Sequence, residues 1–259
     1  MTFDNQYRKI AYDFITKGVK IHPKNWQAIE SPMPTYELLN AHITYQTHSQ
    51  VGDLAEDVKP NLPWADSHFL ERIGGEPLNP GETYKIWPFY RMDKDMRREG
   101  DKFSHTYMER FWPKLAGKGL GDDRPNYGIR YQYGDLQDLV MQLLDDPLTR
   151  QAYLPIFFPE DTGNRMKQRV PCTLGYQFIL RDGKLYINYY MRSCDFMRHF
   201  RDDVYLACRL LISILNVLKI RDQENWGNVT PGPLNMYMTS LHIFESDMYS
   251  LKKLLKWEE

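Results

Sequence analysis

The segment 169–204 constrains the fold more than any other part of this chain. Two runs rich in apolar residues flank the tetrapeptide 181–184, Arg-Asp-Gly-Lys, and this pattern predicts a β-hairpin. Cys172 stands two residues before the first run, and the second run leads into Arg192 and Ser193. We therefore expect a cysteine and a pair of anion-binding side chains to meet at one end of a hairpin.

A long helix is predicted directly after this hairpin. The acidic pair Asp202 and Asp203 opens an apolar run from Asp203 to Ile220, whose apolar residues recur at helical spacing on one face. Aspartate is a preferred helix N-cap, and acidic side chains suit the first turn of a helix. Because capping needs only one of the two carboxylates, the other is free for a different role.

Composition limits the class of protein. The chain has 259 residues, 42% of them hydrophobic, which is enough for one sizeable core or two small domains. The 18 Tyr, 12 Phe and 6 Trp indicate a packed α/β or α+β body rather than disorder. A formal net charge of -1 provides no bulk attraction to nucleic acid or to a membrane surface, so we expect neither partner.

Redox and targeting signals favour a cytoplasmic protein. Three cysteines without paired spacing argue against a disulfide framework. Residues 1–18 are amphipathic and charged and lack the apolar core of a signal peptide. No run approaches the roughly 20 apolar residues that span a bilayer. The seven histidines form no metal-binding motif, so no metal is expected.

Further elements follow from periodicity and from turn residues. We expect helices at 4–18, 134–148 and 247–257, and strands at 153–158 and 235–244. Residues 36–45 are apolar enough to be buried, as either a helix or a strand.

Two segments in the first half of the chain can be interpreted from their residue types. A short helix is predicted from Asp66 to Ile73, with Asp66 as its N-cap and the pair Gly74-Gly75 as its stop. Residues 91–123 are dense in charge and are expected to form a surface insertion, helical or partly ordered over 103–114.

Taken singly, the candidate site residues have structural readings as well as functional ones. A thiolate at Cys172 would be a nucleophile, and nearby arginines can lower a thiol pKa, but most free cysteines are simply buried. Arg192 with Ser193 would suit a phosphate, and so would Arg150, although each arginine also fits a surface position. A lone histidine on an apolar strand, such as His242, is usually structural.

Several motifs in order resemble the thymidylate synthase family over roughly residues 125–250. They are Pro-Cys at Cys172, Asp-Gly-Lys-Leu at the hairpin turn, Arg-Ser-Cys-Asp ending at Asp195, and Asp203 eight residues after that aspartate. The segment Ser-Leu-His-Ile-Phe around His242 resembles the family's His-x-Tyr element, and Asp-Asp-Pro-Leu-Thr-Arg-Gln around Arg150 resembles its arginine-bearing segment.

The resemblance implies a fold and a set of roles. The expected fold is α+β, one thymidylate synthase-like domain over 1–259 with a large mixed β-sheet, flanking helices and a homodimer formed through the sheet. Cys172 would attack C6 of a pyrimidine nucleotide. The 5′-phosphate would be held by Arg192, Ser193 and Arg150 of the partner subunit, and the sugar by His242. Asp195 would contact the pterin of 5,10-methylenetetrahydrofolate.

The departures from the family pattern indicate the base. Thymidylate synthases carry Asn where this chain has Asp203, and the surrounding residues resemble phage deoxycytidylate hydroxymethylases, which carry Asp there. A carboxyl can accept from the amino group of cytosine and, when protonated, donate to N3. A wrong base would leave a buried polar group unpaired, at a cost of about 1–3 kcal/mol.

Other departures leave alternatives open. Phe244 replaces the tyrosine of His-x-Tyr, which removes a sugar contact, and Arg150-Gln151 replaces a pair of arginines. The family's catalytic glutamate is matched within one position by Glu71, and Glu37 in Tyr-Glu-Leu-Leu is its rival.

The sequence thus predicts a dCMP 5-hydroxymethylase that transfers a one-carbon unit from methylenetetrahydrofolate to C5, with water completing the hydroxymethyl group. Such an enzyme would supply precursors for modified phage-type DNA. The alternatives are a C5-methyltransferase acting on dCMP or dUMP, and an inactive relative that only binds a nucleotide.

Overall fold

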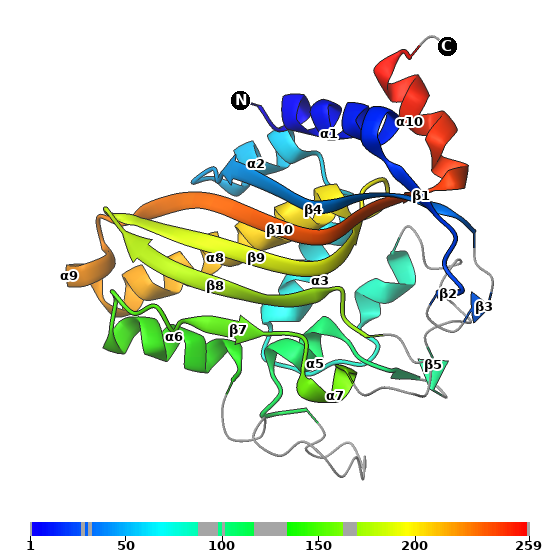
Figure 1. Ribbon diagram of the computed structural model, residues 1–259. Coiled ribbons are helices and arrows are strands. Elements are labelled where there is room, and N and C mark those ends of the chain that lie inside the picture. The colour runs from blue at the N-terminus through cyan, green and yellow to red at the C-terminus, as the bar shows by residue number, and fades with distance from the viewer. Residues whose placement is uncertain are drawn as a thin grey trace.

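A six-stranded mixed sheet forms the centre of the part of the chain that the computed structural model describes. The described residues are 2–26, 29–30, 33–87, 98–99, 102–116, 134–162 and 170–257. The strand order is β1-β4-β10-β9-β8-β7, and the neighbours β9 and β10 are parallel whereas all other pairs are antiparallel (Figure 1). The strands span Val19–Ile21 (β1), Thr35–Gln46 (β4), Tyr153–Pro155 (β7), Thr173–Arg181 (β8), Lys184–Asp195 (β9) and Thr230–Phe244 (β10). The expectation of α+β content with a large mixed sheet is confirmed.

The predicted hairpin joins β8 to β9. Arg181 pairs with Lys184, and both central residues have positive φ, 50° at Asp182 and 68° at Gly183. Two positive φ values match the turn that best fits the right-handed twist of paired strands. Along β9, buried and partly exposed residues alternate, so one face of the hairpin lies in the core.

Helix α8 (Phe200–Arg221) packs along one face of β9 and β10 (Figure 1). It begins three residues before the predicted start, with His199 as N-cap, so neither Asp202 nor Asp203 caps it. Asp202 instead accepts hydrogen bonds from the backbone N–H and the side-chain amide of Asn61, at 2.8 and 2.7 Å. Both carboxylates of the acidic pair are therefore available for tertiary contacts.

Helix α3 (Trp64–Ile73) also starts earlier than predicted. Its N-cap is Pro63, which makes no side-chain capping bond, so the assignment of Asp66 as N-cap is wrong. Asp66 lies inside the first turn, where its carboxylate accepts hydrogen bonds from the hydroxyl of Tyr205, at 2.6 Å, and from the guanidinium of Arg209. A tertiary ion pair with α8 thus replaces the local cap. The predicted glycine stop is confirmed.

The remaining elements surround the same sheet. Residues 36–45 belong to strand β4, and the predicted terminal helices are confirmed. The helices are α1 (Phe3–Lys17), α2 (Val51–Val58), α5 (Tyr107–Phe111), α6 (Leu136–Asp145), α7 (Pro159–Thr162), α9 (Gln223–Trp226) and α10 (Met248–Leu255), with 3₁₀ turns η1 (Glu82–Ile86) and η3 (Glu245–Asp247). Two short strand pairs complete the list: β2 (Asn25–Trp26) with β3 (Ile29–Glu30), and β5 (Arg98–Glu99) with β6 (Lys102–Phe103).

The charged segment 91–123 is only partly described. Its residues 91–97, 100–101 and 117–123 lie outside the described part of the chain. Within 102–116, the expected surface location is wrong, because Phe103, Met108 and Phe111 are buried. Helix α5 packs against α3 and brings this segment to the pocket described below.

The sheet face opposite α8 is named here the open face. It carries the aromatic side chains of His42, Tyr237, Tyr190 and Tyr153, which come from β4, β10, β9 and β7 and lie next to one another in that order. Figure 1 shows the strands passing in front of α8, with no described helix drawn across their near side. Tyr153 and Tyr237 are 41% and 40% exposed.

Candidate active site

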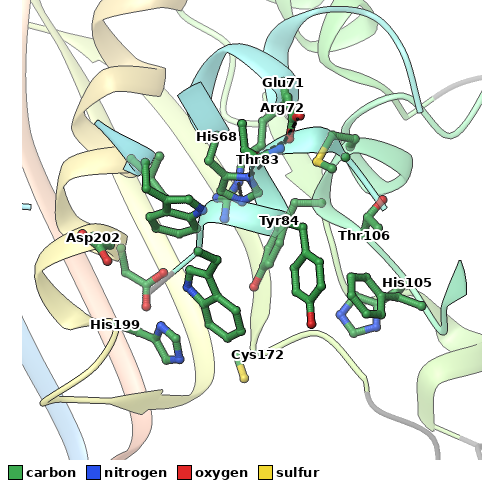
Figure 2. Close-up of a pocket in the computed structure, with 18 of the residues that line it drawn as sticks. His68, Glu71, Arg72, Thr83, Tyr84, His105, Thr106, Cys172, His199 and Asp202 are labelled. Carbon is green, nitrogen blue, oxygen red and sulfur yellow. Dashed lines mark hydrogen bonds and ion pairs between the residues drawn. The ribbon is translucent and has the colours of Figure 1, made fainter. Parts of the chain in front are cut away.

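One cavity lies between α3, η1 and α5 on one side and the β8-β9 pair with the start of α8 on the other (Figure 2). Five of the predicted site residues line it: Glu71, Cys172, Ser193, Asp195 and Asp203. Their elements are separate in the sequence, so the fold brings these side chains together. The cavity wall is largely aromatic, with Trp64, Tyr84, Trp87 and Phe103 among its lining residues.

Cys172 immediately precedes β8 and is only partly buried, unlike the other two cysteines. The hydroxyl of Ser193 donates to its Sγ at 3.5 Å, and the guanidinium of Arg192 lies 3.8 Å from the same sulfur. Backbone pairing fixes this approach, since the N–H of Arg192 donates to the carbonyl of Cys172 at 2.9 Å. Two donors directed at one sulfur can stabilise negative charge on it.

The guanidinium of Arg192 also braces the turn that carries the cysteine. Its Nε donates to the carbonyl of Pro171 at 2.8 Å and an Nη donates to that of Val170 at 3.0 Å. The other Nη donates to the hydroxyl of Ser193 at 3.2 Å. Arg192 therefore positions Cys172 directly, and its predicted phosphate contact stays a prediction.

Asp203 points into the cavity, not toward the backbone of its own helix. The thiol of Cys194 donates to its Oδ2 at 3.6 Å. Burial raises the pKa of Asp203 to about 7, although the nearby charge of Arg72 opposes the rise. A carboxyl that titrates near neutral pH can both accept and, when protonated, donate a hydrogen bond.

The two rival glutamates lie in different places. Glu71 lines the cavity, where its carboxylate accepts hydrogen bonds from the backbone N–H of Thr83, at 2.9 Å, and from the Thr83 hydroxyl. Glu37 lies on β4, opposite Val19 on one side and His242 on the other, and is not a lining residue. The geometry supports Glu71, and its catalytic role stays a prediction.

Asp195 lines the cavity, but its carboxylate is already engaged. Oδ1 accepts from the backbone N–H groups of Met197 and Arg198, both at 3.1 Å, and Oδ2 accepts from the Arg198 guanidinium at 3.0 Å. Burial raises the pKa of Asp195, and the charge of Arg198 opposes this. A pterin that contacts Asp195, as predicted, would have to bind a carboxylate that already accepts these three hydrogen bonds.

Three predicted substrate contacts are not among the residues that line the cavity: Arg192, described above, His242 and Arg150. His242 is opposite Asp195 in the parallel β9-β10 register, and burial lowers its pKa to about 4, which keeps the ring neutral. Arg150 is exposed in the loop after α6, and its carbonyl accepts from the side-chain amide of Gln177 at 3.0 Å. Gln177 in turn accepts from the hydroxyl of Tyr190 at 3.4 Å, so Arg150 lies at the rim of the open face.

Sequence reasoning missed a buried polar group beneath the cavity. The guanidinium of Arg72 lies over the ring of Tyr107, 4.1 Å from its centroid. The Tyr107 hydroxyl is 3.0 Å from Oγ1 of Thr173, which is 2.8 Å from the hydroxyl of Tyr189. Arg72 is almost fully buried although its neighbours in sequence suggest an ordinary helix surface. Only its adjacency to Glu71 could have drawn attention to it.

Comparisons with known proteins agree with this architecture. A sequence model of the family described as "Thymidylate synthase" matches residues 81–259. The chain belongs to the thymidylate synthase family. Family membership indicates a folate-dependent transferase that acts on C5 of a pyrimidine, with methylenetetrahydrofolate as cosubstrate. Glu71 lies before the matched region.

Two individual proteins are similar to the chain. A protein of Methanococcoides burtonii named "Putative thymidylate synthase" is 23% identical over 164 residues, which cover 61% of this chain and 70% of that protein. The "Deoxyuridylate hydroxymethyltransferase" of Bacillus phage SP01 is 31% identical over 153 residues, which cover 58% of this chain and 36% of that protein. The match thus spans just over a third of the phage protein.

Two further observations concern the described residues only. In them, no three His, Cys, Asp or Glu side chains gather in an arrangement that could hold a metal ion. Nor does any helix in this part of the chain have the length and apolar character needed to cross a membrane.

Proposed function

We propose that the protein is a dCMP 5-hydroxymethylase that makes precursors for modified phage-type DNA. The observation that carries the proposal is the placement of Asp203 in the same cavity as Cys172, with a pKa raised to about 7. A protonated Asp203 donates to N3 of cytosine through one oxygen and accepts from the amino group through the other. The donation to N3 needs the proton that burial favours, whereas the other oxygen accepts from the amino group with or without it.

Cys172 is the nucleophile. Its sulfur adds to C6 of the ring, and this makes C5 electron-rich enough to form a new carbon–carbon bond. Ser193 and Arg192 stabilise the thiolate before the attack and the same sulfur when the bond to C6 breaks at the end. When bound, methylenetetrahydrofolate would supply the one-carbon unit and leave as tetrahydrofolate, C5 would lose its proton to solvent, and water would add to the transferred carbon.

The cavity fits a folate as well as a base. Flat aromatic side chains line it, and stacked rings are favourable for a pterin. Glu71, held as a hydrogen-bond acceptor, orients the water that completes the hydroxymethyl group and accepts its proton. Asp195 and its partner Arg198 are charged groups that can contact the folate next to the base.

The phosphate and the sugar are bound at the rim. Arg192 and Ser193 lie on the phosphate side, and His242 binds the sugar as a neutral ring. Arg150 reaches the site of a second subunit across the open face. Support comes from the ladder of four aromatic rings on that face, since a large exposed aromatic patch is typical of an interface.

A second candidate is hydroxymethylation of dUMP. It is favoured by the similarity to the phage protein named deoxyuridylate hydroxymethyltransferase. With its proton on the other carboxyl oxygen, the same carboxylic acid could also donate to O4 of uracil and accept from the N–H at N3. Methylation of dCMP or dUMP is the other reaction within the same class, and an inactive nucleotide-binding relative is the alternative outside it.

The test measures tritium release from 5-tritiated dCMP and, separately, 5-tritiated dUMP in the presence of methylenetetrahydrofolate. We expect release from dCMP in preference to dUMP, and none with Cys172→Ala. Absorbance of dihydrofolate, recorded in the same reaction, distinguishes methylation from hydroxymethylation. Preference for dUMP would overturn the base assignment. No tritium release from either nucleotide would overturn the proposed activity and would favour an inactive, nucleotide-binding relative.

A further inference from the structure

We propose that His68 and Thr83 are positioning residues that hold Glu71 as an oriented carboxylate at the cavity. This inference deepens the proposed function, on which the catalytic role of Glu71 rests. Figure 2 shows the four side chains of Arg72, His68, Thr83 and Glu71 joined in a chain of hydrogen bonds. No motif in the sequence pointed to His68 or Thr83.

The chain of hydrogen bonds has one direction. Nε of Arg72 can only donate, and it lies 3.0 Å from Nε2 of His68, so Nε2 is the acceptor. A neutral imidazole then carries its proton on Nδ1, which lies 3.2 Å from Oγ1 of Thr83. Because the Thr83 oxygen accepts this proton, its own hydroxyl hydrogen is directed to Oε2 of Glu71. Every donor in the chain therefore points toward the carboxylate.

The environment of His68 enforces the neutral ring. Its pKa is lowered to about 4, first by burial and then by the charge of Arg72. The indole of Trp64 stacks on the imidazole, with ring centroids 4.9 Å apart and planes 16° from parallel. A second proton on Nε2 would face the N–H of Arg72, so the packing favours the neutral ring with its proton on Nδ1.

Thr83 contacts Glu71 twice. Its backbone N–H donates to Oε1 at 2.9 Å while its hydroxyl donates to Oε2, so each carboxylate oxygen has its own donor. Gly81 closes the third side, because a Cβ at that position would overlap the Glu71 carboxylate. The orientation of the carboxylate is thus set by η1 and the residue before it, although Glu71 itself belongs to α3.

Other titratable groups face this cavity from the surrounding elements. They are Arg72 of α3, Tyr84 of η1, His105 before α5, Tyr107 of α5, Cys172 before β8, Cys194 and Asp195 of β9, His199 before α8, and Asp202 and Asp203 of α8. Burial pushes the pKa of Glu71 upward, but the two hydrogen bonds from Thr83 and the nearby imidazole of His68, whose Nδ1 lies 3.8 Å from Oε2, outweigh it and hold the pKa below its ordinary value. Removal of the Thr83 hydroxyl should therefore raise the pKa of Glu71.

The direct test is a carbon-13 NMR titration of the Glu71 carboxyl, assigned with Glu71→Gln. We compare Thr83→Val, which has the same shape without the hydroxyl, with Thr83→Ser, which keeps it. In Thr83→Val the midpoint should rise by about one pH unit, a tenfold change in proton affinity, and in Thr83→Ser it should stay at the wild-type value. An unchanged midpoint in Thr83→Val overturns the proposal.

His68 provides an independent pair of variants. The amide of His68→Gln can accept from Arg72 and donate to Thr83, whereas His68→Leu can do neither. We expect the Glu71 titration to stay near wild type in His68→Gln and to rise in His68→Leu. Equal titration in both variants would overturn the role of His68.

Kinetics separate positioning from general stability. The acidic limb of the pH profile for formation of the 5-hydroxymethyl product should move upward in Thr83→Val with the Glu71 midpoint, while the KM for the nucleotide stays within about twofold. The NMR titration needs no substrate, so it still reports on the hydrogen-bond chain if the wild type releases no tritium. Absence of tritium release from the wild type would count against the proposed function but not against the role of His68 and Thr83.

Discussion

The thiol of Cys194 donates to Oδ2 of Asp203 across 3.6 Å, and both residues line the same cavity as Cys172. Burial, opposed by the charge of Arg72, raises the pKa of this carboxyl to about 7. The group is thus available as a hydrogen-bonding acid near neutral pH, which an asparagine amide at the same place could not be.

Replacement of this carboxyl should change base preference. Asp203→Asn gives an amide like that of the thymidylate synthases, so the ratio of kcat/KM for dCMP to that for dUMP should fall. One mismatched buried hydrogen bond, at about 1–3 kcal/mol, corresponds to a change of roughly 5- to 100-fold. Competition between the two nucleotides in one reaction gives the ratio directly, and an unaltered ratio would refute the base-reading role.

The same carboxyl should make stability depend on pH. Its pKa rises from the ordinary 3.8 to about 7 on folding, so across this window the folded protein keeps a proton that the unfolded chain has lost. The free energy of unfolding therefore falls as pH rises from about 4 to about 7.

Asp203→Asn lacks this titration and serves as the comparison. Urea unfolding of both proteins at about pH 5 and about pH 8 should show the wild type losing stability relative to the variant, by an amount on the order of 1–4 kcal/mol. Parallel behaviour of the two proteins over this range would show that Asp203 titrates normally.

The sequence predicted those elements that are specified by residues close together in the chain, such as turn residues and apolar residues at helical spacing. The Asp-Gly turn specified the hairpin, and the apolar spacing of 203–220 specified most of α8. The predictions that failed depend on tertiary partners. Asp66 binds Tyr205 and Arg209 on another helix instead of its own N-terminus. The charged segment around Phe103 is buried because α5 packs on α3, which no local pattern shows.

The reactive thiol should be identifiable without substrate. Cys172 is partly buried, whereas Cys194 and Cys208 are buried and burial raises the pKa of both. Brief treatment of the native protein with iodoacetamide should label Cys172 alone, and a bound nucleotide should protect it. Peptide mass spectrometry locates the label.

Two variants control this experiment. Cys172→Ala should remain unlabelled and should release no tritium, while Cys208→Ala, which changes a buried residue outside the cavity lining, should label and react as the wild type does. Comparable labelling of Cys172→Ala and wild type would contradict the assignment of the nucleophile.

The open face should form a homodimer. Tyr237 stacks on His42 at 4.4 Å and on Tyr190 at 5.3 Å between ring centroids, in the middle of that face. Tyr237→Arg would place two charges near a twofold axis and should convert a dimer to a monomer in sedimentation experiments. Activity should fall with it, because Arg150 would no longer reach a partner site.

Tyr249→Arg is the matched control, since Tyr249 is exposed on α10 and lies outside the open face. It should leave the sedimentation coefficient and the activity unchanged. A wild type that sediments as a monomer, or a Tyr237→Arg variant that stays dimeric, would contradict the interface.

Of the eight site residues predicted from the sequence, five line the cavity. Resemblance located Cys172, Ser193 and Asp203 because their motifs are short and contiguous. It could not reveal that the guanidinium of Arg192 binds the backbone carbonyls beside the cysteine. Nor could it reveal Thr83, whose contact with Glu71 depends on how η1 folds over α3.

The most direct test is the mass of the product formed from dCMP and methylenetetrahydrofolate by the wild-type protein. Hydroxymethylation predicts a nucleotide heavier than dCMP by one CH₂O unit, with no dihydrofolate, and no such product with Cys172→Ala. A product heavier by one CH₂ unit, or a product from dUMP but none from dCMP, would contradict the account.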